Sequence, residues 1–281
     1  MFGHISDAER NRMLTQDVPS AVWLAAIARR HSRRTFDHTP AENLALDAIE
    51  QVCARFRPYA DARTVLVRRP ESDIFKGIVG GYGKVTNAPH VLVFIGDARS
   101  HYADQHVGYV GQAAILEATS HDLETCWIGG FFDQKRASAL VALEPGERIL
   151  AVSPLGHGAA TTSSTERSMK VLARSSSRES LDTIAPGDRS AWPQWAVAAV
   201  ETARIAPSAV NRQPWRFRLD GESLVISVNS RRETPKVTRR LDCGIAMLHA
   251  ELGALAYGVA GSWTDLADGL DVARFDPASV S

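Results

Sequence analysis

Apolar residues near the start of the chain are spaced as in amphipathic helices. Residues 18–30 predict one such helix, because its apolar side chains recur on a single face. That face comprises Val22, Trp23, Ala26 and Ile27. Pro40 is expected to open a second helix, since its fixed φ suits a first helical turn. The apolar face of the second helix is predicted to be Leu44, Leu46, Ile49, Val52 and Cys53.

Continuous apolar runs farther along predict buried strands. Residues 91–95 form such a run, residues 64–67 are a short strand candidate, and residues 149–155 are another strand, ended by Gly156-His157-Gly158. Residues 111–123 are apolar and rich in alanine, which predicts a helix deep in the core.

The pattern changes between residues 159 and 190, where Ser, Thr and Arg dominate. Beyond it, residues 195–205 predict a helix, and residues 242–259 predict a second buried helix. Residues 215–219 and 224–228 predict a hairpin that turns at Asp220-Gly221. We therefore expect a first unit over residues 13–158, a crossing segment over 159–190 and a shorter second unit over 191–281.

The two units also resemble each other. Residues 54–63 align without gaps on residues 203–212, with about half of the positions identical. Gly111-Gln112-Ala113 likewise matches Gly244-Ile245-Ala246. The match predicts an internal duplication, although chance similarity in a chain rich in Ala and Arg is the alternative.

Composition excludes several function classes. The 281 residues carry a formal net charge of zero, so we expect neither a nucleic acid nor a membrane as partner. The three cysteines are widely spaced and odd in number, which is typical of reduced thiols in the cytoplasm. No pair of histidines has metal-binding spacing with a third ligand nearby, so no metal site is expected.

Two basic clusters could bind a small anion. Arg30, Ser32 and Arg34 alternate in sequence, so an extended backbone would place their side chains on one face. Guanidinium groups bind phosphate oxygens in a bidentate manner and stay charged at neutral pH. The second cluster contains Arg167 and Lys170. The alternative is that both clusters are simply solvated.

The segment from Ala206 to Trp215 is more specific. Ser208 and Asn211 offer short polar side chains, and an Asn amide both donates and accepts, which suits the edge of a flavin ring. An ordinary helix-to-strand loop would explain Pro207 and Pro214 equally well. It would not explain the whole order Asn-x-Gln-Pro-Trp.

Residues 30–36 and 206–215 both resemble signature segments of the nitroreductase family of FMN-dependent oxidoreductases. Residues 84–94 resemble the family's lysine-then-strand element, and residues 126–131 resemble the segment that passes flavin N5. Many members carry Glu where this chain has Gly129, which leaves no side-chain role at that position. The spread of these segments over one chain resembles a single-chain fused subgroup.

The resemblance implies an α+β, nitroreductase-like fold, with a mainly antiparallel sheet flanked by helices and the two units packed as a pseudo-dimer. It also implies one FMN between the units. The residues implied to hold the cofactor are Arg30, His31, Ser32, Arg34, Lys84, Gly129, Gly130, Arg167, Lys170, Pro207, Ser208 and Asn211. Because each half lacks the segment that the other retains, one competent site and one vestigial site are expected per chain. A monomeric pseudo-dimer is therefore expected rather than an obligate homodimer.

The activity implied is a ping-pong reaction in which NAD(P)H reduces the flavin and a nitroaromatic, quinone or related small acceptor then oxidises it. No protein residue is expected to be catalytic, because the flavin carries the chemistry. Two alternatives stay open. One is other flavin chemistry, dehydrogenation or dehalogenation of a specific metabolite, and the other is a non-catalytic flavin-binding protein.

Overall fold

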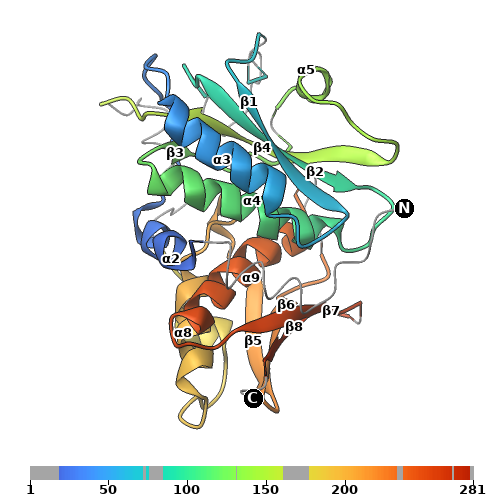
Figure 1. Cartoon of the computed structure of the whole chain (residues 1–281). Helices are drawn as coiled ribbons and strands as arrows, with labels where there is room; N and C mark the ends of the chain where they lie inside the picture. The colour runs from blue at the N-terminus through green and yellow to red at the C-terminus, as the bar shows by residue number, and fades with distance from the viewer. Residues whose placement is uncertain are drawn as a thin grey trace.

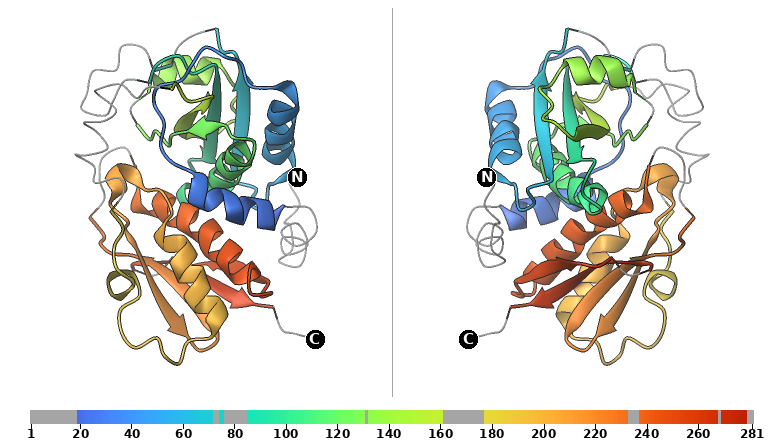
Figure 2. Two further views of the ribbon diagram at one scale, coloured as in Figure 1. Left: turned by 90° about the vertical axis from the view of Figure 1, so that its left-hand side faces the viewer. Right: turned by 90° about the vertical axis from the view of Figure 1, so that its right-hand side faces the viewer.

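Two α+β units, one after the other in the chain, make up the molecule (Figure 1). The structure, a computed structural model, describes residues 19–71, 74–75, 85–130, 132–160, 177–232, 237–267 and 269–278. Each unit has a four-stranded antiparallel sheet with its long helices packed on one face. The long helices of the two units face each other and form the inner layers, and the sheets lie outside them (Figure 2). The short helix Gln134–Ala139 packs on the outer face of the first sheet through Ala137.

The first unit has the sheet order β1-β2-β4-β3. Its elements are α2 (Ser20–Arg29), α3 (Asn43–Arg55), β1 (Ala62–Arg68), β2 (His90–Asp97), α4 (Ala103–Ser120), β3 (Glu124–Thr125), α5 (Gln134–Ala139) and β4 (Glu147–Gly156). Strand β2 reads as a continuous apolar run because both of its faces are buried. Leu92 and Phe94 join the helix-covered core, whereas Val91, Val93 and Ile95 join a second cluster on the opposite face.

The second unit has the sheet order β5-β6-β8-β7. Its elements are α7 (Leu181–Ile184), α8 (Gln194–Arg204), the 3-10 turn η1 (Ala209–Asn211), β5 (Trp215–Asp220), β6 (Ser223–Val228), α9 (Arg239–Leu255), β7 (Gly261–Asp265) and β8 (Asp271–Pro277). The predicted β5–β6 hairpin is present, with Trp215 opposite Val228, but Asp220 still pairs with Ser223 and the turn lies at Gly221-Glu222, one residue later than predicted.

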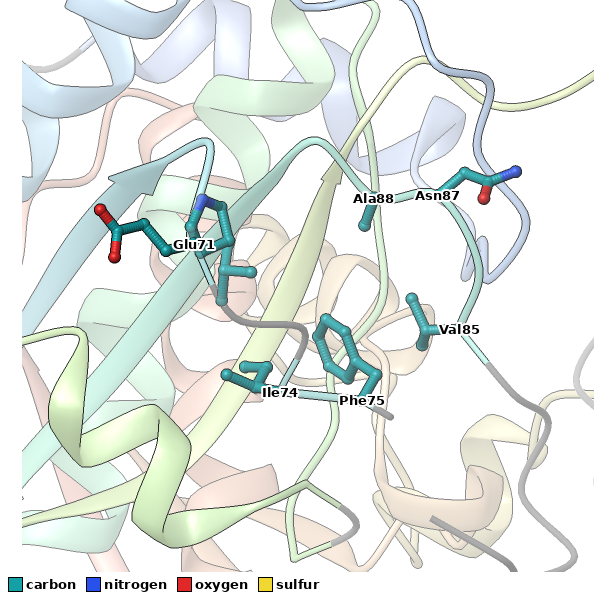
Figure 3. Close-up of a pocket in the computed structure, with 8 residues that line it drawn as sticks. Glu71, Ile74, Phe75, Val85, Asn87 and Ala88 are labelled. Atoms are coloured by element: carbon teal, nitrogen blue, oxygen red, sulfur yellow. The ribbon is translucent and has the colours of Figure 1, made fainter. Parts of the chain in front are cut away.

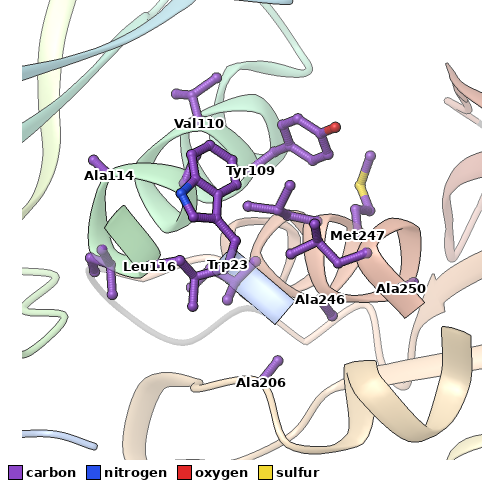
Figure 4. Close-up of a cluster of buried hydrophobic side chains, with 14 of the residues drawn as sticks. Trp23, Tyr109, Val110, Ala114, Leu116, Ala206, Ala246, Met247 and Ala250 are labelled. Atoms are coloured by element: carbon purple, nitrogen blue, oxygen red, sulfur yellow. The ribbon is translucent and has the colours of Figure 1, made fainter. Parts of the chain in front are cut away.

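Helices α4 and α9 cross at the centre of the molecule, where two glycines allow their backbones to meet. A Cβ on Gly108 would lie 2.1 Å from the carbonyl oxygen of Leu241, and one on Gly244 would lie 1.8 Å from that of Gln105. These contacts are reciprocal, so Gly108 and Gly244 occupy equivalent positions about an approximate two-fold axis. Side chains of both units join there in one hydrophobic cluster with α2 (Figure 4). The cluster includes Trp23, Tyr109, Ala246 and Met247.

Matching strand order and matching bulges fit the predicted duplication. The β2–β4 register shifts between Phe94 and Ile95, and the β6–β8 register shifts between Ile226 and Ser227. Aligning these bulges and the helix crossing makes Gly108, not Gly111, the counterpart of Gly244. The predicted pairing of Gly111 with Gly244 is therefore wrong by three residues.

The gapless alignment of residues 54–63 on 203–212 also needs correction. Residues 56–61 join α3 to β1, whereas residues 205–214 join α8 to β5, so the second loop is four residues longer. The two helix ends match, but Ala62 starts a strand whose counterpart starts at Trp215. The segment that contains Ser208 and Asn211 is thus an extended loop of the second unit alone.

Other predicted boundaries differ modestly from the observed ones. Helix α4 begins at Ala103 instead of residue 111, and α9 spans Arg239–Leu255 instead of 242–259. Residues 161–176 of the crossing segment lie outside the described residues. No helix in the described ranges is long and apolar enough to cross a membrane.

Candidate functional site

Arg30 lies at the C-terminal end of helix α2, which packs against α4 of the first unit and α9 of the second, and the residue is half-buried. Arg30 is the C-cap of α2, where its backbone N–H still bonds Ala26 while its ψ of 124° turns the chain into an extended path. That path is held by a bridge between Ser32 and Thr125 and by a 2.9 Å hydrogen bond from the Arg33 N–H to the Thr125 carbonyl. The backbone of the Arg-x-Ser-x-Arg segment is therefore extended at Arg30 and Ser32, and a shared face for its three side chains stays a prediction.

The guanidinium of Arg30 is the unusual charge of this region. Its Nη1 is buried and has no hydrogen-bond partner among the described residues. The pKa of Arg30 is lowered to about 10, chiefly by burial and also by the neighbouring Arg178, whereas Cys126 and Glu124 act in the opposite direction. An enclosed cation with a free donor is a favourable place for an anion.

Arg178 joins the Arg30 region to the loop of the second unit. Its Nη1 donates to Asn211 Oδ1 at 3.1 Å, while Asn211 Nδ2 donates to the Ser177 carbonyl at 2.9 Å. Burial lowers the pKa of Arg178, and so does Arg204 at the end of α8. Segments from opposite ends of the sequence thus meet around one guanidinium.

The loop of residues 205–214 adopts a strained backbone. Val210, Asn211 and Gln213 have φ angles of 50°, 56° and 44°, in the left-handed region. Ser208 Oγ accepts a 2.9 Å hydrogen bond from the Gln213 N–H, which closes the turn. Gln213 in turn accepts from the Glu179 N–H at 2.9 Å, so the crossing segment is fastened to this loop.

Glycines bring the first unit close to the same loop. A Cβ on Gly129 would lie 2.5 Å from Val237 Cγ2, so only glycine allows this approach. Gly130 has a φ of 83°, which also favours glycine. Val237 is tied to the loop by Arg212, whose Nη2 donates to the Val237 carbonyl at 3.2 Å.

A buried chain of hydrogen bonds crosses from Trp127 into the second unit. Trp127 Nε1 donates to Gln112 Oε1 at 2.9 Å, and the Gln112 amide lies 2.8 Å from His249 Nε2. His249 Nδ1 lies 3.3 Å from the Thr202 carbonyl. Burial lowers the pKa of His249 to about 3, with Arg30 and Arg178 adding to the effect. A neutral His249 imidazole can accept a hydrogen bond from the Gln112 amide at Nε2 and donate one from Nδ1 to the Thr202 carbonyl. This tautomer satisfies every group in the series of hydrogen bonds.

The pseudo-symmetric place, between the short loop of the first unit and β7 of the second, is filled by side chains of both units. The β3–β4 and β7–β8 registers make Asp265 the counterpart of Gly129. Its carboxylate accepts from His106 Nε2 at 2.9 Å, and His106 Nδ1 donates to Asp61 at 2.6 Å. Tyr59 stacks on the His106 ring, with centroids 3.6 Å apart. The glycine of one site is thus replaced by a carboxylate and an aromatic stack in the other.

A separate pocket of about 290 Å³ lies beside the first sheet (Figure 3). It is lined by Pro70, Glu71, Ile74, Phe75, Val85, Asn87, Ala88 and Val91. Its described lining is mostly apolar and includes neither Arg30 nor Asn211. The pocket therefore lacks the basic groups that distinguish the region between the units.

Comparisons with known proteins identify the chain's relatives. The sequence profile of the family described as "Putative TM nitroreductase" matches residues 23–254. The chain belongs to this family. It is therefore a nitroreductase-type oxidoreductase. No curated protein gives a significant match.

The likeness to a solved structure supports the nitroreductase fold. A structure described as a "putative nitroreductase" from Thermotoga maritima aligns with 21% identity and a TM-score of 0.55, covering 90% of this chain and 92% of that one. A Bacteroides fragilis nitroreductase with bound FMN aligns with 17% identity and a TM-score of 0.40, covering 50% of this chain and 90% of that one. The Thermotoga likeness is the one that supports a common fold.

The predicted site residues of this nitroreductase fall into three groups. Arg30, Ser32, Gly129, Gly130, Pro207, Ser208 and Asn211 lie in the segments brought together between the units. His31 is turned toward Glu124, with its Nε2 3.1 Å from the carboxylate, and the Arg34 carbonyl accepts from the Thr86 N–H at 2.9 Å. Lys84, Arg167 and Lys170 lie outside the described residues.

Four further residues in or beside the candidate site were not predicted from the sequence. Arg178 lies in a Ser- and Arg-rich segment without periodicity, so nothing distinguished it from its basic neighbours. Gln112 and His249 lie on apolar helices and are brought together only by the α4–α9 crossing. Asp242 holds the second-unit loop and follows no recognisable motif. A buried polar residue within an apolar helix was the available signal for the last three.

Proposed function

We propose that this chain is an FMN-dependent oxidoreductase that uses NAD(P)H to reduce nitroaromatic, quinone or related small acceptors by a ping-pong mechanism. Membership of the nitroreductase family supports the reaction class. The FMN bound to the Bacteroides fragilis nitroreductase is compatible with this cofactor.

One observation carries the proposal. The Arg30 segment and the Asn211 loop, which resemble the two halves of the family's flavin site, meet at Arg178 between the two units. They are separated by about 180 residues, so their meeting depends on the fold and not on sequence proximity.

The side chains present fit a phosphorylated flavin. The free Nη1 of Arg30 is a suitable donor for a phosphate oxygen, and Arg178 adds a second positive charge nearby. The loop of Ser208 and Asn211 offers the polar edge expected beside a flavin ring. When bound, FMN supplies the capacity to accept a hydride from a nicotinamide and to reduce a second substrate. The protein's own residues bind and orient it, and Gly129 allows Val237 of the second unit to approach the first unit closely.

We also propose one such site per chain in a monomeric pseudo-dimer. In the place related by pseudo-symmetry, His106 is paired with Asp61 and Asp265, and Tyr59 stacks on its ring. The cation there is already paired with carboxylates, unlike the Arg30 guanidinium, whose Nη1 has no partner among the described residues.

The test is a two-step anaerobic experiment on the FMN-reconstituted full chain. NADH or NADPH is expected to bleach the visible flavin absorbance, and a quinone or nitroaromatic added after removal of the nucleotide is expected to restore it. Bound flavin that neither nucleotide reduces would point to the non-catalytic flavin-binding alternative. Reduced flavin that none of these acceptors oxidises would favour dehydrogenation or dehalogenation of a specific metabolite.

A further inference from the structure

The loop of residues 205–214 needs a specific restraint. Its φ angles at Val210, Asn211 and Gln213 are all in the left-handed region, which is unfavourable for residues with a Cβ and worst for the β-branched Val210. None of residues 56–61, in the shorter counterpart loop, has a positive φ. The extra length of the second loop thus comes with backbone strain that other contacts must offset.

Asp242 supplies contacts of this kind from the first turn of α9. The side chain is 1% exposed. Its Oδ1 accepts from the Ala209 N–H at 3.0 Å, and its Oδ2 accepts from Arg212 Nε at 2.6 Å. A carboxylate is also favoured near a helix N-terminus, because free backbone N–H groups point toward it.

Arg212 extends the same contact toward the first unit. Its Nη2 donates to the Thr238 carbonyl at 2.6 Å and to the Val237 carbonyl at 3.2 Å. The Val237 side chain packs directly against Gly129. The Asp242–Arg212 pair therefore links the loop to α9 and to the glycine segment of the opposite unit.

The equivalent position in the first unit makes a related contact with the charges reversed. The α4–α9 crossing makes His106 the counterpart of Asp242, and His106 binds Asp61 at the end of the shorter loop. In both units, then, the first turn of the central helix binds the preceding helix-to-strand loop. In the second unit alone, that contact restrains a strained loop.

We propose that the Asp242–Arg212 ion pair is a positioning element that holds the 205–214 loop in the conformation required to bind the flavin ring. The proposal rests on the proposed function and adds residues that touch no cofactor themselves. It follows that breaking the pair weakens binding of the ring and leaves the phosphate contact of Arg30 intact.

The experiment compares FMN with riboflavin, which lacks the phosphate, on the full chain. Dissociation constants are measured by flavin fluorescence for wild type, Asp242→Asn, Arg30→Ala and Asp61→Asn. Asp242→Asn is expected to raise both constants by a similar factor of about ten or more. Arg30→Ala is expected to raise mainly the FMN constant. Asp61→Asn breaks the corresponding contact in the first unit and is expected to leave both constants within about twofold.

The outcomes distinguish failure of the positioning role of Asp242–Arg212 from failure of the proposed flavin-dependent function. Equal affinities for wild type and Asp242→Asn would overturn the positioning role while leaving the proposed function intact. Equal losses for Asp242→Asn and Asp61→Asn would also overturn it, because general destabilisation would then explain both. A wild-type chain that binds neither flavin would overturn the proposed function and this inference together. Should Asp242→Asn fail to fold, Arg212→Lys removes the bonds to Val237 and Thr238 with the charge retained, and the same losses are expected.

Discussion

At the scale of single residues, a few charged groups in unusual surroundings define the proposed flavin site. Arg30 has an enclosed nitrogen without a partner among the described residues, and Asp242 is a fully buried carboxylate at a helix start. Burial raises the pKa of Asp242 to about 6, although Arg212 opposes this shift. At neutral pH the Asp242–Arg212 pair is therefore mostly charged.

Arg30→Ala tests the phosphate role most directly. Loss of the guanidinium is expected to weaken FMN binding by about 1–3 kcal/mol, because charge-assisted hydrogen bonds to the phosphate disappear. Arg34→Ala is expected to weaken it in the same direction if Arg34 also faces the phosphate. Titration of the apoprotein with FMN measures both. If Arg30→Ala bound FMN as tightly as wild type, the assignment of Arg30 to the FMN phosphate would be wrong.

Single residues also mark where sequence reasoning reaches its limit. The Arg30 and Asn211 segments were predictable because their residue order matches a known family. Arg178 was not, because its role comes from contacts with Asn211 and the Arg30 region, which no local pattern encodes. The expectation that Asn211 faces the flavin ring is untested, since its amide here binds Ser177 and Arg178.

At the scale of elements, the helix crossing shapes the molecule. Gly108 and Gly244 let α4 and α9 approach until backbone meets backbone, and the site forms beside this contact. The apolar runs predicted both helices. Gly111 was incorrectly matched with Gly244, because Gly-x-Ala occurs once in each helix and suggested that pair. The reciprocal contact identifies Gly108 as the counterpart of Gly244.

Gly244→Ala is expected to destabilise the fold by about 1–3 kcal/mol, because the new Cβ would overlap the Gln105 carbonyl and push the helices apart. Chemical denaturation measures the free energy of unfolding. Gly221→Ala is the matched control, since its Cβ meets open space and its φ of 62° alone should cost about 1 kcal/mol. A smaller loss at Gly244 than at Gly221 would contradict the close crossing.

A strand could be predicted where its burial leaves a clear pattern in the sequence, either a continuous apolar run or an alternation of apolar and polar residues. Strand β2 and the β5–β6 hairpin follow from apolar runs and a turn signal. Strands β3, β7 and β8 were missed. Strand β3 is only two residues long, and β7 contains Gly, Ser, Thr and Asp, so pairing with β4 and β8 defines them more than composition does.

At the scale of the whole molecule, His106 links the two units. It bonds Asp61 of the first unit and Asp265 of the second. Burial lowers the pKa of His106, but the hydrogen bonds and charges of Asp265 and Asp61 outweigh it, and the net shift is above the ordinary 6.5. The ionised form therefore contributes stability below about pH 6.5, which is lost as pH rises through the folded-state pKa.

Thermal unfolding between about pH 6.5 and 9 tests this contact. Wild type is expected to lose stability as pH rises in this window, and His106→Gln is expected to be less stable at the lower end and flatter throughout. Identical pH profiles for the two proteins would mean that His106 is not a charged link between the units.

The two-unit organisation also leads to the most direct test of the central claim, which is a single flavin site between the units of one chain. The measurement is the flavin-to-chain ratio of the purified, FMN-saturated protein, read from its visible spectrum after mild denaturation. The account predicts about one FMN per chain, because Tyr59, His106 and Asp265 fill the related place. A ratio of about two would show that this place also binds FMN, and a protein that cannot be loaded would contradict the flavin site altogether.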